Sequence, residues 1–85
     1  MSTEPEVVDA RGLRCPLPVV RLAARAKELA AGSEVTVLAT DPAARYDVPA
    51  WARLRGHVMV AEEHHPGNDE ADGGPWWALT VRLED

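Results

Sequence analysis

The pattern of apolar and polar positions predicts six secondary-structure elements along this 85-residue chain. Short apolar or alternating runs predict strands over residues 6–10, 34–40, 57–63 and 76–83. Apolar residues at three-and-four spacing predict a helix over residues 16–31, which should stop at Gly32. A second helix is expected with Asp47 as its N-cap, Pro49 in its first turn and Gly56 at its end. The order is therefore β-α-β-α-β-β.

These elements can bury their apolar stripes as an α+β fold, a two-layer α/β sandwich. Its four-stranded mixed sheet would carry both helices on one face. No repeat or linker divides the chain, so residues 1–85 are expected to form a single domain. Residues 1–5 are expected to be disordered. Residues 64–75 are turn formers and acids, which predicts a flexible acidic hairpin loop.

Charge and composition exclude several classes of function. The net charge of −5 argues against nucleic-acid binding, and residues 57–85 carry seven acids and one base. Apolar runs of only a few residues predict no membrane span, and the acidic N-terminus does not resemble a secretory signal. A single cysteine cannot form an internal disulfide and fits a reducing compartment. We expect a cytoplasmic protein, and a monomer.

The stretch Arg14-Cys15-Pro16-Leu17-Pro18 holds this cysteine directly before the first predicted helix. Cys15 falls where an N-cap residue would lie, and Pro16 at the first helical position, where proline is tolerated. A helix N-terminus presents free N–H groups and partial positive charge, which stabilise a thiolate. Cys15 is therefore expected to be more acidic and more nucleophilic than a free cysteine, with Arg14 and Arg11 adding positive charge nearby.

Five further residues have candidate roles around this thiol. Pro16 and Pro18 are expected to fix the backbone so that the thiol projects from the helix start. Arg21 and Arg25 could extend a partner-binding face along the helix, or be ordinary solvated arginines. Asp41 could shape the site, or simply cap the turn after the second strand.

The histidines do not predict a metal site. His57, His64 and His65 could in principle join Cys15 as four ligands, but their spacing fits no zinc motif. Adjacent histidines rarely share one metal with good geometry. A surface histidine pair in the 64–75 loop is the simpler interpretation.

The three tryptophans are expected to matter to packing. Trp51 is predicted to lie in the core. Trp76 and Trp77 should point to opposite faces of the last strand, so that one is buried and the other is available for a partner contact.

Three ordered segments resemble the signatures of the TusA/SirA sulfur-carrier family. The segment from Asp9 to Pro18, Asp-Ala-Arg-Gly-Leu-Arg-Cys-Pro-Leu-Pro, is similar to the family's first signature with its Cys-Pro-x-Pro core. Thr40-Asp41-Pro42 is similar to the second. Asp47-Val48-Pro49-Ala50-Trp51, followed by Gly56-His57, completes the likeness. Ala52 departs from it, since many relatives have a second cysteine there.

The resemblance implies the same two-layer sandwich and a function for Cys15. The thiol would accept sulfane sulfur as a persulfide and pass it to a partner protein. Donors in the family include cysteine desulfurases and rhodanese-like enzymes. Acceptors belong to relays for tRNA thiolation, to molybdenum-cofactor enzymes and to sulfur metabolism. Such a protein is a sulfurtransferase only in the broad sense, without a substrate pocket of its own or a cofactor beyond the transient persulfide.

Two other interpretations of the cysteine stay open at this point. The chain could be a thiol-based redox regulator, although no second cysteine is present to resolve a sulfenic acid. It could also be an interaction module in which Cys15 is a small buried hydrophobic residue, as free cysteines often are.

Overall fold

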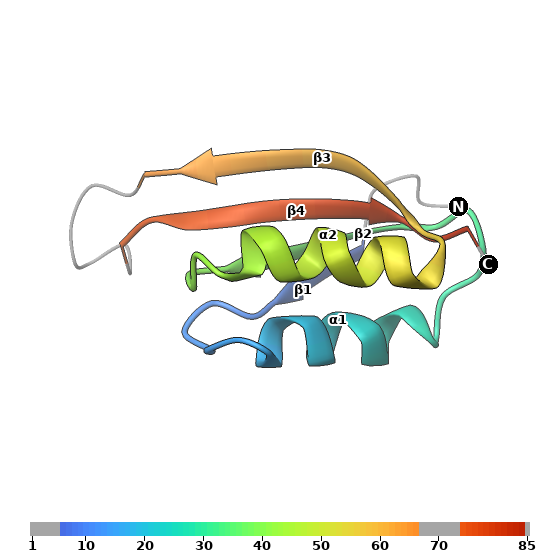
Figure 1. Ribbon diagram of the computed structural model, residues 1–85, viewed down its shortest axis with the longest axis horizontal. Helices are drawn as coiled ribbons and strands as arrows, with labels where there is room; N and C mark the ends of the chain where they lie inside the picture. Colours follow the sequence, from blue (N-terminus) through green and yellow to red (C-terminus); the bar gives the residue numbers. More distant parts are fainter. Residues whose placement is uncertain (1–5, 67–73, 85) are drawn as a thin grey trace.

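Four strands and two helices follow one another in the predicted order (Figure 1). The computed structural model describes residues 6–66 and 74–84. Its elements are β1 (Glu6–Asp9), α1 (Leu17–Ala26), β2 (Glu34–Ala39), α2 (Ala44–Arg55), β3 (Val58–His65) and β4 (Trp76–Arg82). In this described part of the chain, neither helix is long and apolar enough to cross a membrane.

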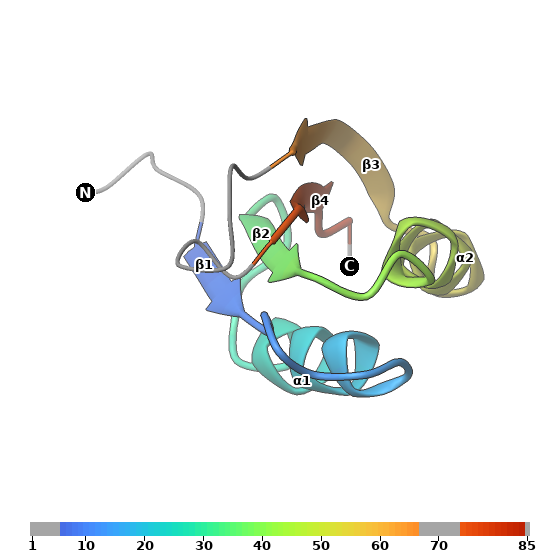
Figure 2. The same cartoon turned by 90° about the vertical axis from the view of Figure 1, so that its left-hand side faces the viewer.

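The strands form one mixed sheet in the order β1-β2-β4-β3. β1 pairs with β2 in parallel, whereas β2 with β4 and β4 with β3 pair antiparallel. Val8 lies opposite Val37, and Val37 lies opposite Leu79, so one row of apolar side chains crosses three strands. Both helices lie on the same side of this sheet (Figure 2). The predicted fold class is therefore confirmed.

The core lies between the helices and the covered face of the sheet. Leu22 of α1 and Val48 of α2 are fully buried there. One face of β4 and of the residue after it is buried, and its members are Trp77, Leu79, Val81 and Leu83. Trp76 lies on the opposite face from Trp77, as predicted, and is half-buried. Trp51 is also half-buried and packs against the core from one side.

Helix α1 is shorter than the predicted 16–31. It begins at Leu17, because Pro16 is its N-cap, and ends at Ala26. Beyond that point the chain continues in tight turns, in which the N–H of Leu29 donates to the carbonyl of Ala26 at 3.2 Å. This tightening lets Leu29 pack against the core, and leaves Gly32 in the turn before β2.

Helix α2 begins at Ala44, so the predicted start with Asp47 as N-cap is wrong. Asp41 instead satisfies a backbone N–H at the start of the helix, because its Oδ1 accepts the N–H of Ala43 at 3.0 Å. Asp47 lies in the first turn and Pro49 inside the helix. The helix ends at Gly56, as predicted, with a φ of 79° that suits glycine.

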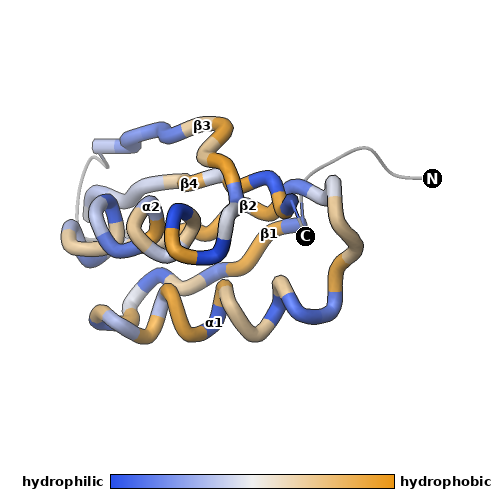
Figure 3. Tube along the Cα trace, turned by 45° about the vertical axis from the view of Figure 1, so that its right-hand side comes forward, coloured by the Kyte–Doolittle hydropathy of each residue, from blue (hydrophilic) through white to orange (hydrophobic). Residues whose placement is uncertain are grey.

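Strand β3 extends through His64 and His65, which were predicted to be loop residues. The register places each histidine opposite a tryptophan of β4. The ring of His64 stacks on Trp77 at 4.9 Å between centroids, and that of His65 stacks on Trp76 at 4.0 Å. Such cross-strand pairs stabilise a strand end that is hydrophilic by composition (Figure 3). The rest of the predicted acidic loop at 67–73, and the predicted disorder of residues 1–5, fall outside the described residues.

Candidate functional site

The loops after β1 and β2 leave the sheet at the same edge, because these strands are parallel (Figure 1). The first loop carries Cys15 into α1, and the second carries Asp41 into α2. The carboxyl ends of parallel strands are where open α/β sheets commonly place functional groups. Two segments far apart in sequence therefore meet at one end of the molecule.

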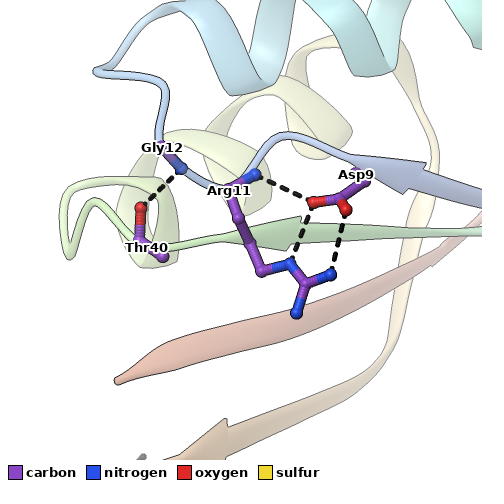
Figure 4. Close-up of polar contacts among 4 residues, drawn as sticks. All are labelled: Asp9, Arg11, Gly12 and Thr40. Atoms are coloured by element: carbon purple, nitrogen blue, oxygen red, sulfur yellow. Dashed lines mark hydrogen bonds and ion pairs between the residues drawn. The ribbon is translucent and has the colours of Figure 1, made fainter. Parts of the chain in front are cut away.

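Polar contacts connect these two loops. The N–H of Gly12 donates to Oγ1 of Thr40 at 2.9 Å (Figure 4). Gly12 has a φ of 86°, a left-handed backbone conformation that suits glycine. The N–H of Cys15 donates to Oδ2 of Asp41 at 3.0 Å, while Oδ1 of the same carboxylate accepts from Ala43. Asp41 thus holds the cysteine loop against the start of α2.

Cys15 lies one residue before the N-cap of α1, half-buried against the core. Burial, a hydrogen bond from the thiol to Asp47, and the charges of Asp41 and Asp47 raise the pKa of Cys15 to about 11. The expectation of an unusually acidic thiol is therefore wrong. A helix N-terminus lies close by, but burial of the thiol and the negative charges of Asp47 and Asp41 disfavour the thiolate.

The two arginines predicted to support the thiolate have other contacts. Arg11 forms a bidentate ion pair with Asp9, with Nη2 to Oδ2 at 2.9 Å (Figure 4). Its guanidinium also lies 5.1 Å from the ring centroid of Trp76. The positive charge of Arg14 acts on Asp41 and helps to hold the pKa of that carboxyl below its ordinary value, after the hydrogen bonds from Cys15 and Ala43.

The remaining predicted site residues lie on α1 or just before it. Pro18 is fully buried, and Pro16 is exposed and follows a cis peptide bond. Arg25 forms ion pairs with Glu6 and Glu28, whereas Arg21 is exposed. A role for these two arginines in partner binding stays a prediction.

Asp47 is a residue near the thiol for which the sequence predicts only a helix cap. In the structure its carboxylate, after burial, is a main cause of the raised pKa of Cys15. The available signal was topological. Once β1 and β2 are parallel, the first turn of the helix after β2 must lie beside the loop after β1.

No group of three potential metal ligands occurs within residues 6–66 and 74–84. His64 and His65 stack on tryptophans that face opposite sides of the sheet, so their rings point apart. The geometry of this adjacent pair therefore does not suit one shared ion.

A family model described as sulfurtransferase TusA matches residues 6–82. The chain belongs to the TusA family. It is 38% identical over 65 residues to the sulfur carrier protein TusA of Pseudomonas putida strain W619, covering 76% of this chain and 81% of that protein. It is 42% identical over 60 residues to the protein of the same name from Pseudomonas entomophila, covering 71% and 75%.

A solved structure of the SirA-like protein from Desulfitobacterium hafniense shares the fold. The TM-score is 0.68 at 29% identity, with 93% of this chain and 97% of that chain covered. The family match over residues 6–82 includes both loops that form the Cys15 site. The resemblance inferred from three short signatures is thereby confirmed.

Proposed function

We propose that this TusA-family protein is a sulfur carrier that accepts sulfane sulfur as a persulfide on Cys15 and transfers it to a partner protein. One observation carries the proposal within the family: the only cysteine lies at the sheet edge, half-buried, on a loop fixed to Asp41. A carrier thiol must be held in a defined place and remain open to another protein. This position meets both needs.

The loading step is an exchange at sulfur. Cys15 sulfur attacks the outer sulfur of a donor persulfide, the donor's S–S bond breaks, and the donor leaves as a thiolate. The thiol proton of Cys15 passes by way of Asp47, its hydrogen-bond acceptor, toward the departing thiolate. The second step repeats this exchange with an acceptor thiol. No external oxidant or reductant is consumed, because the transferred sulfur keeps its oxidation state.

The raised pKa makes this exchange depend on the partner. With a pKa of about 11, Cys15 is almost entirely protonated near pH 7, so it reacts slowly with small molecules in solution. A docked donor supplies a thiolate that can accept the proton at the moment of attack. The carrier is thus unreactive alone and competent in the complex.

The proposed donors are a cysteine desulfurase or a rhodanese-like protein, and the acceptor is a downstream protein of tRNA thiolation, molybdenum-cofactor enzymes or sulfur metabolism. Transfer between chains is required, because the chain has no second cysteine. We further propose a cytoplasmic monomer without a resident cofactor.

The rival function, a thiol-based redox regulator, requires a thiolate that peroxide oxidises readily. The carboxylates around Cys15 oppose that requirement, since they raise the pKa of the thiol. The interaction-module interpretation requires that Cys15 be dispensable.

The function can be tested with cysteine labelled at sulfur and a cysteine desulfurase, followed by removal of small molecules without reductant. The wild type should retain label that dithiothreitol releases, and Cys15→Ser should retain none while keeping its circular dichroism spectrum. Rhodanese with labelled thiosulfate provides the second donor. Absence of label with both donors, together with rapid oxidation of Cys15 by peroxide, would favour the regulator.

A further inference from the structure

A second candidate site lies at the opposite end of the molecule from Cys15. A cavity of about 350 Å³ opens between the carboxyl-terminal ends of α1 and α2. Both helices run away from the Cys15 end of the molecule (Figure 1), and the cavity is lined by residues of their carboxyl-terminal halves. The proposed sulfur chemistry does not use it.

Five of the eight described lining residues of the cavity are apolar: Ala23, Ala26, Leu29, Trp51 and Leu83. The volume of about 350 Å³ falls within the range of pockets that take small ligands. An aromatic ring of modest size can stack or pack edge-on against the indole.

The polar groups at the rim are hydrogen-bond donors. Lys27 and Arg55 line the cavity and are exposed, and within residues 6–66 and 74–84 neither forms an ion pair. His57 also lines it, and its Nδ1 accepts the N–H of Glu84 at 3.1 Å. A neutral ring with an occupied Nδ1 carries its proton on Nε2, which is then a third donor. The described lining contains no carboxylate.

This charge distribution contrasts with the rest of the chain. The protein carries a net charge of −5, yet the described lining of this cavity has two cations and no acid. Cations in the last turn of a helix also complement its dipole. Arg53 serves that purpose in α2 without lining the cavity, so it provides a natural control.

We propose that this cavity binds a small aromatic carboxylate, with the ring against Trp51 and the carboxylate between Lys27 and Arg55. The apolar lining residues account for the ring, and Lys27, Arg55 and His57 account for the negative charge. A neutral ring would leave the cations without a partner, and a simple inorganic anion would leave the walls without contacts. The ligand class is therefore an organic monoanion with one ring system.

The test uses 1-naphthylacetate as probe and its neutral amide, 1-naphthylacetamide, as matched ligand, in titrations of the full chain followed by NMR. The acid should shift the signals of the Trp51 indole and of Ala26, and bind about tenfold more tightly than the amide, as expected for a charge-assisted contact. Arg55→Glu and Lys27→Glu should each weaken binding of the acid by about tenfold, while Arg53→Glu changes it less than about twofold. Cys15→Ser should bind like the wild type.

Three results would overturn the proposal: equal binding of acid and amide, equal effects of Arg55→Glu and Arg53→Glu, or no saturable shift around Trp51. Affinity that falls as protein concentration rises, with a dimer in light scattering, would assign the cavity to a second copy of the chain instead. The Lys27 and Arg55 variants should still take up labelled sulfur, so this proposal and the carrier function fail independently.

Discussion

The N–H of Cys15 donates a 3.0 Å hydrogen bond to Oδ2 of Asp41, a residue 26 positions later in the chain. The other oxygen of that carboxylate accepts from Ala43 at the start of α2. The Asp41 side chain therefore connects the loop that carries Cys15 to the segment that leads into α2. Both backbone hydrogen bonds favour the ionised form, and the charge of Arg14 adds to them, so the pKa of Asp41 lies below 3.8.

Replacing Asp41 should loosen the cysteine loop without unfolding the domain. In Asp41→Ala both acceptors are lost, whereas in Asp41→Asn one amide oxygen remains to accept a single N–H. Amide hydrogen exchange at Cys15 and Ala43 should therefore accelerate strongly in Asp41→Ala and less in Asp41→Asn. Asp9→Ala is the matched control, because the described hydrogen bonds of the Asp9 carboxylate are all to Arg11. Unchanged exchange at Cys15 in Asp41→Ala would contradict the role given to this carboxylate.

The same contact should depend on pH in a defined direction. Because folding lowers the pKa of Asp41, its stabilisation is present above its ordinary pKa of 3.8 and is lost as the pH falls through the lowered value. Exchange at Cys15, corrected for intrinsic rates, should stay slow at pH 5 and rise only below about pH 4. In Asp41→Asn this dependence should be absent. Loosening of the wild-type loop between pH 5 and 7 would point to another titrating group.

Asp47→Asn should make Cys15 more reactive. The substitution removes a negative charge and the acceptor that favours the protonated thiol, so the pKa of Cys15 should fall from about 11 toward its ordinary value near 9. Alkylation by iodoacetamide at pH 8 should accelerate by roughly three- to tenfold, since a more acidic thiolate is also intrinsically less nucleophilic. Asp9→Asn carries the same change of charge and should alter the rate little. A slower reaction in Asp47→Asn would mean that Asp47 acts mainly as a base.

The loss of stability on replacing a leucine by alanine should depend on how deeply that leucine is buried. Leu22 is fully buried between α1 and the sheet, whereas Leu54 of α2 is 81% exposed. Leu22→Ala should lower the free energy of unfolding by about 2–5 kcal/mol through lost burial and the cavity left behind. Leu54→Ala should change it by less than about 0.5 kcal/mol. Urea denaturation of both variants measures the difference, and equal effects would contradict the described packing.

The fold could be predicted because its elements have strong periodic signals. Strand β4 alternates so regularly that its buried face, including Trp77 and Leu79, follows from the sequence. Gly56 ends α2 where the sequence places the stop. The start of α2 could not be located, because Asp41 interacts with Ala43 before the helix and Asp47 looks equally suitable as a cap. The local sequence alone does not show which of these two aspartates caps the helix.

The sequence shows that Cys15 comes just before a helix, but it does not show which charges lie around the sulfur. Sequence places the thiol at a helix start, which suggests an acidic cysteine. The opposing carboxylate of Asp47 comes from 32 positions later in the numbering and reaches Cys15 only because β1 and β2 are parallel. Arg11 is a second example. It is close to Cys15 in sequence, but in the structure it forms an ion pair with Asp9 and lies over the ring of Trp76. Tertiary contacts, which no local pattern contains, decide which charges reach the sulfur.

The central claim is that Cys15 carries sulfane sulfur, and intact mass spectrometry tests it most directly. Wild type and Cys15→Ser would be incubated with a cysteine desulfurase and cysteine, then measured without reductant. The wild type alone should gain roughly one sulfur that dithiothreitol removes, as expected for a persulfide. An equal gain on Cys15→Ser, or no gain on the wild type with either a desulfurase or a rhodanese and thiosulfate, would contradict it.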